Sequence, residues 1–65
     1  MKILLDKIMS DKNLSTRQVS IMTGISKSTI SRIANGTVSP SADTLEILAE
    51  GLKVRIFDLI DSPYK

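Results

Sequence analysis

The sequence predicts an all-α domain built from five short helices. Three observations support this fold class. Apolar residues recur at i, i+3 and i+4 spacing, the period of an amphipathic helix, through most of the chain of 65 residues. Ser, Asn, Gly and Pro residues interrupt this pattern at short intervals, where helices typically begin and end. The composition is 42% hydrophobic with only Phe57 and Tyr64 as aromatic residues, which is typical of a small aliphatic helical core.

The length and composition indicate one small domain without catalytic chemistry. We expect a single domain over residues 1–65, with a core at about 3–60 and a short tail at 61–65. A chain of this size buries only about 60% of its unfolded surface, so it can gain stability from dimerisation. It contains no cysteine and no histidine, which excludes disulfides, thiolate zinc sites, cysteine nucleophiles and histidine acid–base chemistry. We therefore expect no enzymatic activity, metal ion, cofactor or small-molecule ligand.

The sequence predicts an intracellular protein. No apolar run approaches the roughly 18 residues of a membrane span. Residues 1–10 lack the small-residue cleavage site of a signal peptide, and the absence of cysteine fits a reducing compartment. We expect a cytoplasmic protein that does not associate with membranes.

The first helix is expected at residues 2–12. Its apolar stripe follows helical spacing and consists of Leu4, Leu5, Ile8 and Met9. Asn13 can end this helix, because asparagine tolerates the left-handed backbone conformation.

The second helix is expected at about residues 16–22. Ser15 to Gln18 has the S-x-x-Q form of a capping box, which satisfies two backbone amides at a helix start. The helix is expected to bury Val19 and part of Met22. Gly24 then permits a tight break, because glycine adopts positive φ without a steric penalty.

The third helix is expected to begin after Ser26 and to end at Asn35-Gly36. The Ser26 hydroxyl can accept a hydrogen bond from a free amide of the first turn, and Gly36 can provide a left-handed stop. The apolar residues of this helix share one face and are Ile30, Ile33 and Ala34. The opposite face holds two cations, two hydroxyls and no carboxylate: Lys27, Ser28, Ser31 and Arg32. Such a surface suits the recognition of a polyanion.

The second and third helices together predict a helix-turn-helix. They are joined by a turn of three or four residues that contains glycine, which is the form of this motif. Any corner between two helices of a small bundle also needs a glycine turn. The same window of about 20 residues, however, holds a small residue and four apolar residues that favour the helix-turn-helix: Ser20, Val19, Ile25, Ile30 and Ile33.

The fourth and fifth helices are expected at about residues 42–51 and 55–61. Thr37–Pro40 forms a polar loop before the fourth helix, and Ser41 is its expected N-cap. The buried stripe of the fourth helix consists of Leu45, Leu48, Ala49 and Leu52. Asp61-Ser62-Pro63 ends the last helix. No segment of the sequence predicts a strand or a repeat.

Charge is distributed unevenly along the chain, although the net charge is only +2. Residues 1–36 hold six cations and two carboxylates, whereas residues 37–65 hold three cations and five carboxylates. One side of the domain can therefore face phosphate while the other repels it. An ordinary solvated surface also explains these numbers when charge alone is considered.

Several short segments occur together in the order and spacing of a known family. They are Leu14-Ser15, Thr23-Gly24-Ile25-Ser26, Ser28 to Ile33, Asn35-Gly36, Pro40-Ser41, Thr44-Leu45, Leu48-Ala49, Val54 and Phe57 to Ile60. On these residues the chain resembles the lambda-repressor/Cro-like (XRE) helix-turn-helix family over about residues 3–60. The resemblance implies a compact five-helix domain that places its third helix in the major groove of double-stranded DNA. It also implies that two copies read two half-sites about one helical turn apart.

The resemblance implies base contacts from the third helix. Lys27, Ser28 and Arg32 match positions that face base edges, and Thr29 and Ser31 flank them. Arg32 can pair bidentately with the O6 and N7 atoms of guanine, although a phosphate contact or a solvated position is the alternative. Lys27 suits guanine and phosphate equally well. Ser28, Thr29 and Ser31 are too short to be assigned a base, and Thr29 can equally pack at the helix edge.

Phosphate contacts are expected from residues on either side of that helix. Thr16 matches a family position usually filled by the longer glutamine, so the helix amides can take over its phosphate contact. Asn35 matches a family position that contacts the DNA backbone at the end of the third helix, and Thr37 lies beside it. From their charge, Arg17 and Lys12 are expected on the phosphate side, although a plain surface position suits Lys12 nearly as well.

The chain departs from the family pattern at three points. Ala34 replaces an acidic residue, which removes a negative charge near the DNA. The glycine that precedes Val54 in the family has moved to Gly51, which leaves Lys53 at a helix end that needs positive φ. Arg55 replaces the usual serine cap of the last helix.

A possible dimer contact lies near the C-terminus. Phe57, Ile60 and Tyr64 fall at i, i+3 and i+7, which would place them on one helix face. This stripe can form a two-fold contact between copies, or Phe57 and Ile60 can simply close the small core. Because the family that this chain resembles often dimerises in this region, we favour a homodimer.

These features favour a sequence-specific transcriptional regulator, in particular a repressor that binds a pseudo-palindromic operator as a dimer. The alternative is a protein-interaction module, such as an antitoxin or anti-repressor component, for which DNA binding is secondary. An apolar patch outside the core would favour this alternative, and Ile21 with Met22 is the only additional candidate in the sequence.

Overall fold

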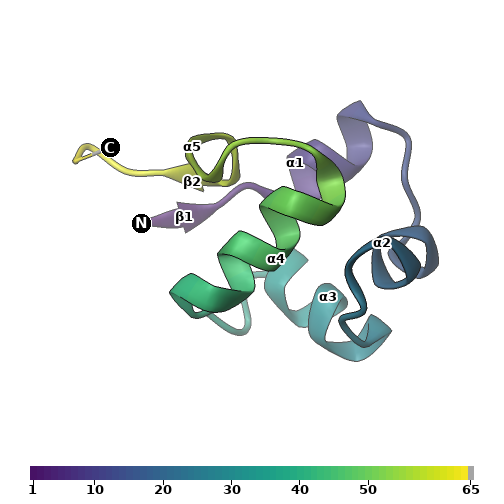
Figure 1. Cartoon of the computed structure of the whole chain (residues 1–65). Coiled ribbons are helices and arrows are strands. Elements are labelled where there is room, and N and C mark those ends of the chain that lie inside the picture. Colours follow the sequence, from purple (N-terminus) through teal and green to yellow (C-terminus); the bar gives the residue numbers. More distant parts are fainter. Residues whose placement is uncertain (65) are drawn as a thin grey trace.

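The computed structural model describes residues 1–64, which form five helices and one small two-stranded sheet (Figure 1). In chain order the elements are β1 (Lys2–Ile3), α1 (Leu5–Asp11), α2 (Thr16–Thr23), α3 (Lys27–Ala34), α4 (Ala42–Leu52), α5 (Ile56–Leu59) and β2 (Ile60–Asp61). The predicted five-helix fold is therefore confirmed. Lys65, the last residue of the expected tail, lies outside the described residues.

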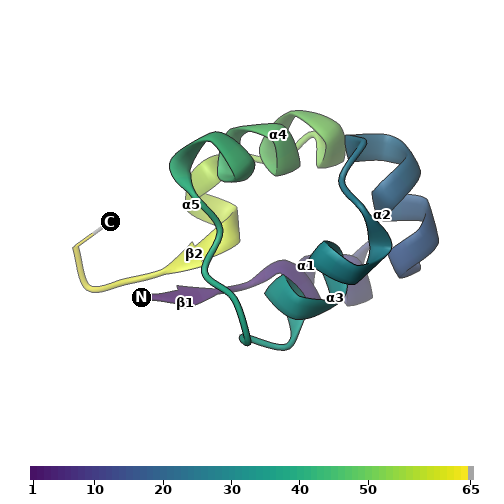
Figure 2. The same ribbon diagram turned by 90° about the horizontal axis from the view of Figure 1, so that it is seen from below.

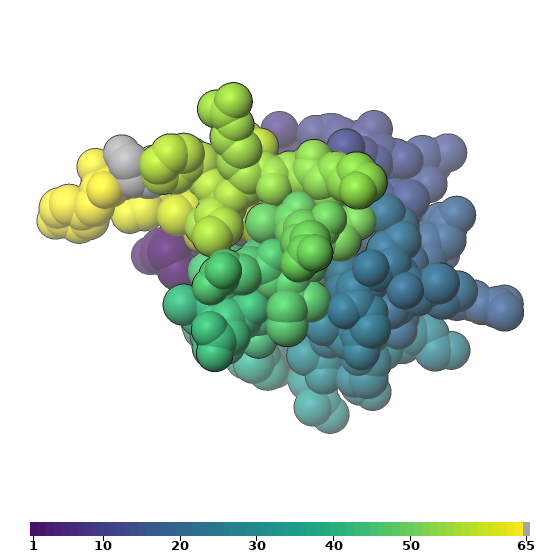
Figure 3. Space-filling model, in the orientation of Figure 1, coloured from purple at the N-terminus to yellow at the C-terminus, as the bar shows by residue number. Residues whose placement is uncertain are grey.

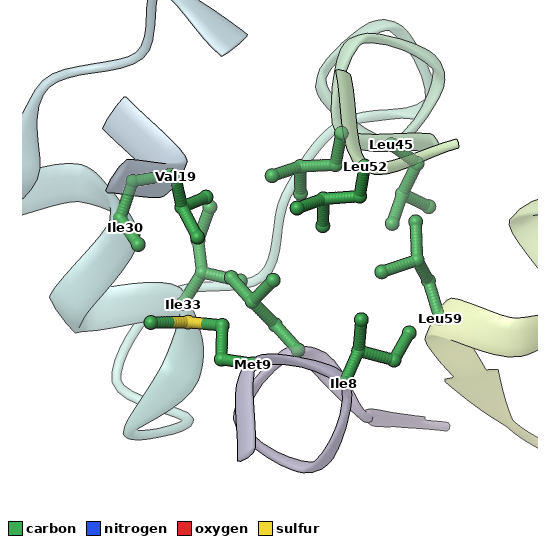
Figure 4. Close-up of a cluster of buried hydrophobic side chains, with 10 residues drawn as sticks. Ile8, Met9, Val19, Ile30, Ile33, Leu45, Leu52 and Leu59 are labelled. Carbon is green, nitrogen blue, oxygen red and sulfur yellow. The ribbon is translucent and has the colours of Figure 1, made fainter. Parts of the chain in front are cut away.

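All five helices contribute to one aliphatic core (Figure 4). Its buried residues are Leu5, Ile8, Met9, Val19, Ile30, Ile33, Leu45, Leu48, Leu52 and Leu59. Among residues 1–64 no polar or charged residue is buried. The apolar stripes predicted for the first, third and fourth helices supply most of this core, because helical spacing brings their members to one side.

Local signals in the sequence place most of the helix ends correctly. The Ser15, Ser26 and Ser41 hydroxyls each accept a hydrogen bond from a backbone amide three residues later. Gly24 and Asn13 adopt positive φ values of 76° and 57° at the ends that they were expected to form. Helices α2 and α4 each continue one residue beyond the prediction, to Thr23 and Leu52.

The two ends of the chain form a ribbon that was not predicted. Helices were expected at 2–12 and 55–61, but Lys2 pairs with Asp61 and Ile3 with Ile60 in antiparallel strands. The Leu4 amide extends the ribbon by donating to the Leu59 carbonyl at 2.7 Å. Asp61 is thus part of a strand and not of a tail. Strands of two residues are too short to show an alternating pattern, and their pairing depends on the meeting of the two chain ends.

The α4–α5 corner contains two of the three departures from the family pattern. Lys53 ends α4 with a φ of 56°. This positive φ was expected, because the glycine that precedes Val54 in the family is displaced to Gly51. Although Arg55 replaces the serine cap, its backbone amide donates to the Asp58 carboxylate at 3.1 Å. The carboxylate of the last helix thus satisfies this amide without a hydroxyl at the cap.

Gly51 marks the closest approach of α4 to α2. A Cβ atom at this position would lie 2.7 Å from the Thr23 methyl carbon and 3.0 Å from the Met22 carbonyl oxygen. The Thr23 hydroxyl donates to the Val19 carbonyl at 2.7 Å and accepts from the Ile25 amide at 3.2 Å, which prevents the methyl group from rotating away. Glycine is therefore required here by the helix crossing and not by the backbone conformation.

We expect Gly51→Ala to destabilise the domain by about 1 kcal/mol, although alanine is the better helix former. Overpacking costs about 1–3 kcal/mol and outweighs a gain in helix propensity of about 1 kcal/mol. Urea unfolding followed by circular dichroism measures the change. Glu50→Ala, an exposed neighbour in the same helix, should shift stability by no more than about 0.5 kcal/mol. A Gly51→Ala variant more stable than the wild type would contradict the close crossing.

Candidate nucleic-acid interface

Both ends of helix α3 are held by hydrogen bonds between residues of the helix and the residues that flank it. The Ser26 hydroxyl accepts from the Thr29 amide at 3.3 Å and donates to the Thr29 hydroxyl at 2.9 Å. At the other end Gly36 has a φ of 78° and its amide donates to the Ile33 carbonyl at 3.1 Å. The Thr37 amide donates to the Arg32 carbonyl at 2.9 Å. These bonds fix the length of the helix and the direction in which its exposed side chains point.

The turn between α2 and α3 is fixed by three side-chain hydrogen bonds. The Ser20 hydroxyl donates to the Ile25 carbonyl at 2.5 Å, and the Thr23 hydroxyl bridges the Val19 carbonyl and the Ile25 amide. Ile25 itself packs against the core. Hydrogen bonds from two short polar side chains and the packing of Ile25 thus hold this turn in place.

One face of α3 is seated in the core and the other is free. Ile30 is 0% and Ile33 1% exposed. The opposite face consists of four exposed residues, Lys27, Ser28, Ser31 and Arg32. Helical spacing arranges them in two adjacent i, i+4 rows, Lys27 with Ser31 and Ser28 with Arg32. Figure 3 shows the teal surface of α3 at the lower edge of the domain.

Thr29 differs from the other predicted base-contacting residues. It is only half-exposed, and its hydroxyl accepts from the Ser26 hydroxyl. The side chain therefore lies at the helix edge as part of the cap. Of the two roles expected for Thr29, a base contact or packing at the helix edge, this placement corresponds to packing at the helix edge.

Helix α2 brings its first turn to the surface. Arg17 is exposed and Thr16 is half-buried. Gln18 is held in the predicted capping box, in which its side chain accepts from the Ser15 amide at 2.8 Å and its own amide donates to the Ser15 hydroxyl at 3.1 Å. Gln18 is thereby engaged at the helix start, which leaves Arg17 as the charged side chain of this turn.

The comparison with protein families decides what kind of domain this is. The model of the family described as Cro/C1-type HTH DNA-binding domain matches residues 4–63. The chain belongs to this family. Comparisons with curated proteins and with solved structures found no match.

Membership assigns DNA binding to this Cro/C1-type domain. Within residues 1–64 no helix is long and apolar enough to cross a membrane. The same residues hold no cluster of three or more potential metal ligands.

The loop after α3 presents side chains and not amides. Asn35 and Thr37 are exposed. Their backbone amides already donate to the Ser31 and Arg32 carbonyls at 2.9 Å each. A phosphate contact from Asn35 or Thr37 of this Cro/C1-type domain would therefore come from the Asn35 carboxamide or the Thr37 hydroxyl.

Lys12 does not lie with the other predicted phosphate contacts. It lines a shallow groove with Lys7, Val54 and Asp58, next to the connection between α4 and α5. Figure 1 shows this connection and α3 on opposite sides of the domain. The position of Lys12 is therefore that of a surface charge, because the fold turns the C-terminal end of α1 away from α3.

The three residues of the expected dimer stripe do not share a helix face. Helix α5 ends at Leu59, and Ile60 lies in β2, where it packs against the core. Phe57 is 61% and Tyr64 94% exposed. Figure 3 shows the yellow C-terminal segment extending from the body of the domain. The helical spacing that grouped the three residues thus ends at Leu59.

A groove beside the C-terminal end of α3 contains a residue that the sequence did not place there. Lys2 and Asn35 line this groove from β1 and from the loop after α3. The sequence assigned Lys2 to the first helix. The signal that would have placed it correctly is the pairing of β1 with β2, which no local pattern shows.

We expect Ser26→Ala to lower the free energy of unfolding by about 1 kcal/mol, because it removes the N-cap of α3. Urea unfolding measures this loss. Ser28→Ala is the matched control, since Ser28 is exposed in the first turn of the same helix and alanine has the higher helix propensity. Equal unfolding midpoints for the two variants would contradict the role of Ser26 as the cap.

Proposed function

We propose that the chain is a transcriptional regulator that binds a pseudo-palindromic operator as a homodimer and represses transcription by occluding the polymerase. The observation that carries this proposal is the exposed face of α3, which has two cations and two hydroxyls and contains no carboxylate. Such a face offers hydrogen-bond donors to the base edges of the major groove without repelling the phosphates that border it.

Within this proposal the four exposed α3 residues read base edges. Arg32 is one turn beyond Ser28, and its guanidinium can donate two hydrogen bonds to the O6 and N7 atoms of a guanine. Lys27 lies at the first turn and reaches either a guanine or a phosphate. Ser28 and Ser31 fill the space between them, while Thr29 acts through the cap.

The phosphate contacts flank α3 on both sides. Arg17 approaches the backbone from the first turn of α2, with Thr16 beside it. Asn35 and Thr37 approach from the loop after α3 through their side chains. These contacts position the helix and contribute affinity that falls with salt, without selecting a sequence.

The homodimer is proposed to form through the C-terminal part of the chain. Phe57 and Tyr64 are its anchors because they are the two aromatic residues of the chain, both are largely exposed, and aromatic residues are enriched at protein interfaces. Ile60 contributes from β2 at the edge of the contact. A two-fold axis here would give two α3 helices a fixed separation.

The test is selection of a binding site from a library of random-sequence duplexes with the full chain. We expect an enriched site with two inverted half-sites whose centres are about 10 base pairs apart. Sedimentation of the protein with and without the selected duplex measures the number of copies bound. Failure to enrich any sequence from the library would contradict the regulator proposal.

A second candidate function is supported by an apolar patch between α2 and α4. Ile21 is 74% exposed, and Met22 and Ile47 are each 44% exposed. Met22 and Ile47 also line a shallow groove with Gly51. This patch would favour a protein-interaction module such as an antitoxin component. Selection of a specific operator that the Ile21→Ser variant binds as tightly as the wild type would argue against it.

A further inference from the structure

A groove separates strand β1 from the loop that follows α3. It is lined by Met1 and Lys2 on one side and by Asn35, Gly36, Val38 and Ser39 on the other. Figure 2 shows β1 next to the teal connection that leaves α3. None of the residues lining the groove carries a carboxylate. The groove therefore continues the acid-free surface of α3 towards the N-terminus.

The register of the ribbon determines which way Lys2 points. Ile3 and Ile60 face each other across the ribbon and pack against the core. Because successive side chains of a strand point to opposite sides, Lys2 points away from the core. Lys2 is exposed. The ribbon thus holds a cation beside the end of α3, which a frayed N-terminus would not do.

We propose that this groove binds the DNA backbone and that the Lys2 ammonium contacts a phosphate next to the one bound by Asn35. The inference rests on the proposed function of α3. Lys2 lies on a strand beside the C-terminal end of α3 and not on the exposed face of that helix. A side chain that flanks the helix in the major groove is placed to contact the DNA backbone that borders the groove and not the base edges. Lys2 therefore adds affinity and not sequence preference.

Asp61 opposes Lys2 across the ribbon. Side chains opposite each other in an antiparallel pair have Cβ atoms about 4.5–5.5 Å apart, so the carboxylate attracts the ammonium in the free protein. A DNA phosphate has to compete with the Asp61 carboxylate for the Lys2 ammonium. The carboxylate also repels the phosphate. Removal of the Asp61 charge should therefore strengthen DNA binding, whereas removal of the Lys2 charge should weaken it.

The first experiment measures the salt dependence of binding to two duplexes of about 30 base pairs, which span two half-sites one turn apart. One duplex carries the selected operator and the other a random sequence. Lys2→Gln should weaken binding to both and make the slope of log K against log salt shallower by about 0.9 for each copy bound, or about 1.8 for the proposed homodimer. Asp61→Asn should strengthen binding to both. Lys7→Gln is the matched control, because Lys7 lies in the groove near Val54 and Asp58, and it should change neither quantity.

The second experiment measures proximity directly. The chain contains no cysteine, so Lys2→Cys provides a single attachment point for an iron–EDTA reagent that cleaves nearby DNA. The conjugate should cut the selected duplex beside each half-site, and the Lys7→Cys conjugate should not. Equal cleavage by the two conjugates, or an unchanged salt slope for Lys2→Gln, would overturn this inference alone. A wild-type protein that binds neither duplex would overturn the proposed function as well.

Discussion

Arg32→Ala should weaken binding to the selected operator about 5- to 150-fold for each half-site occupied, which corresponds to the 1–3 kcal/mol of one bidentate contact with guanine. Arg32 is suited to this contact because its position is fixed from both sides. It lies between Ile30 and Ile33, which are both buried in the core, and its carbonyl accepts from the Thr37 amide at 2.9 Å. The guanidinium is therefore presented by a rigid backbone. Fluorescence anisotropy with the operator and a random duplex measures the change.

The comparison between duplexes separates a base contact from a phosphate contact. Arg32→Ala should reduce affinity for the operator much more than for the random duplex. Arg17→Ala should weaken both to the same degree. Arg55→Ala serves as the matched control, because Arg55 is exposed at the start of α5 and far in the chain from α3. An equal loss on both duplexes for Arg32→Ala would show that Arg32 binds phosphate.

Leu48→Ala should unfold a large part of the protein at 25 °C. Leu48 is 0% exposed at the centre of α4, and truncation of a buried leucine costs about 2–5 kcal/mol. A single core in a chain of this size supplies only about 3–5 kcal/mol of stability. The loss thus approaches the whole free energy of unfolding. Circular dichroism at 222 nm and urea unfolding measure the remaining folded fraction.

The neighbouring residue provides the control for this prediction. Ile47 has nearly the same volume but is 44% exposed, so Ile47→Ala should cost much less. Leu48→Met conserves the volume and should cost less than about 1.5 kcal/mol. Equal losses for Leu48→Ala and Ile47→Ala would show that α4 does not seat Leu48 in the core as the structure has it.

The helix ends were predictable because each depends on residues next to one another in the chain. A serine cap needs only an amide three residues away, and Ser26 and Ser41 behave as expected. The core stripes were predictable for a similar reason, since helical spacing alone brings Leu45, Leu48 and Leu52 to one side. The exposed face of α3 follows from the same rule.

The features that the sequence missed all join parts of the chain that are distant in sequence. Lys2 faces Asp61 only because the two chain ends meet. Lys12 turns to the α4–α5 corner and not to α3, because the packing of α1 decides its direction. Gly51 was read as a displaced helix-end glycine, but its closest neighbour is Thr23 of α2.

The sequence alone determined five helices, their caps, most of the core and the acid-free face of α3. These features depend on hydrogen bonds and side-chain periods that span no more than about four residues. Only the tertiary structure decided that the termini form a ribbon and that α4 crosses α2 closely at Gly51. It also decided that Lys2 lies beside the C-terminal end of α3. Such contacts depend on how packed helices direct the chain ends, and a pattern of neighbouring residues contains no information on that packing.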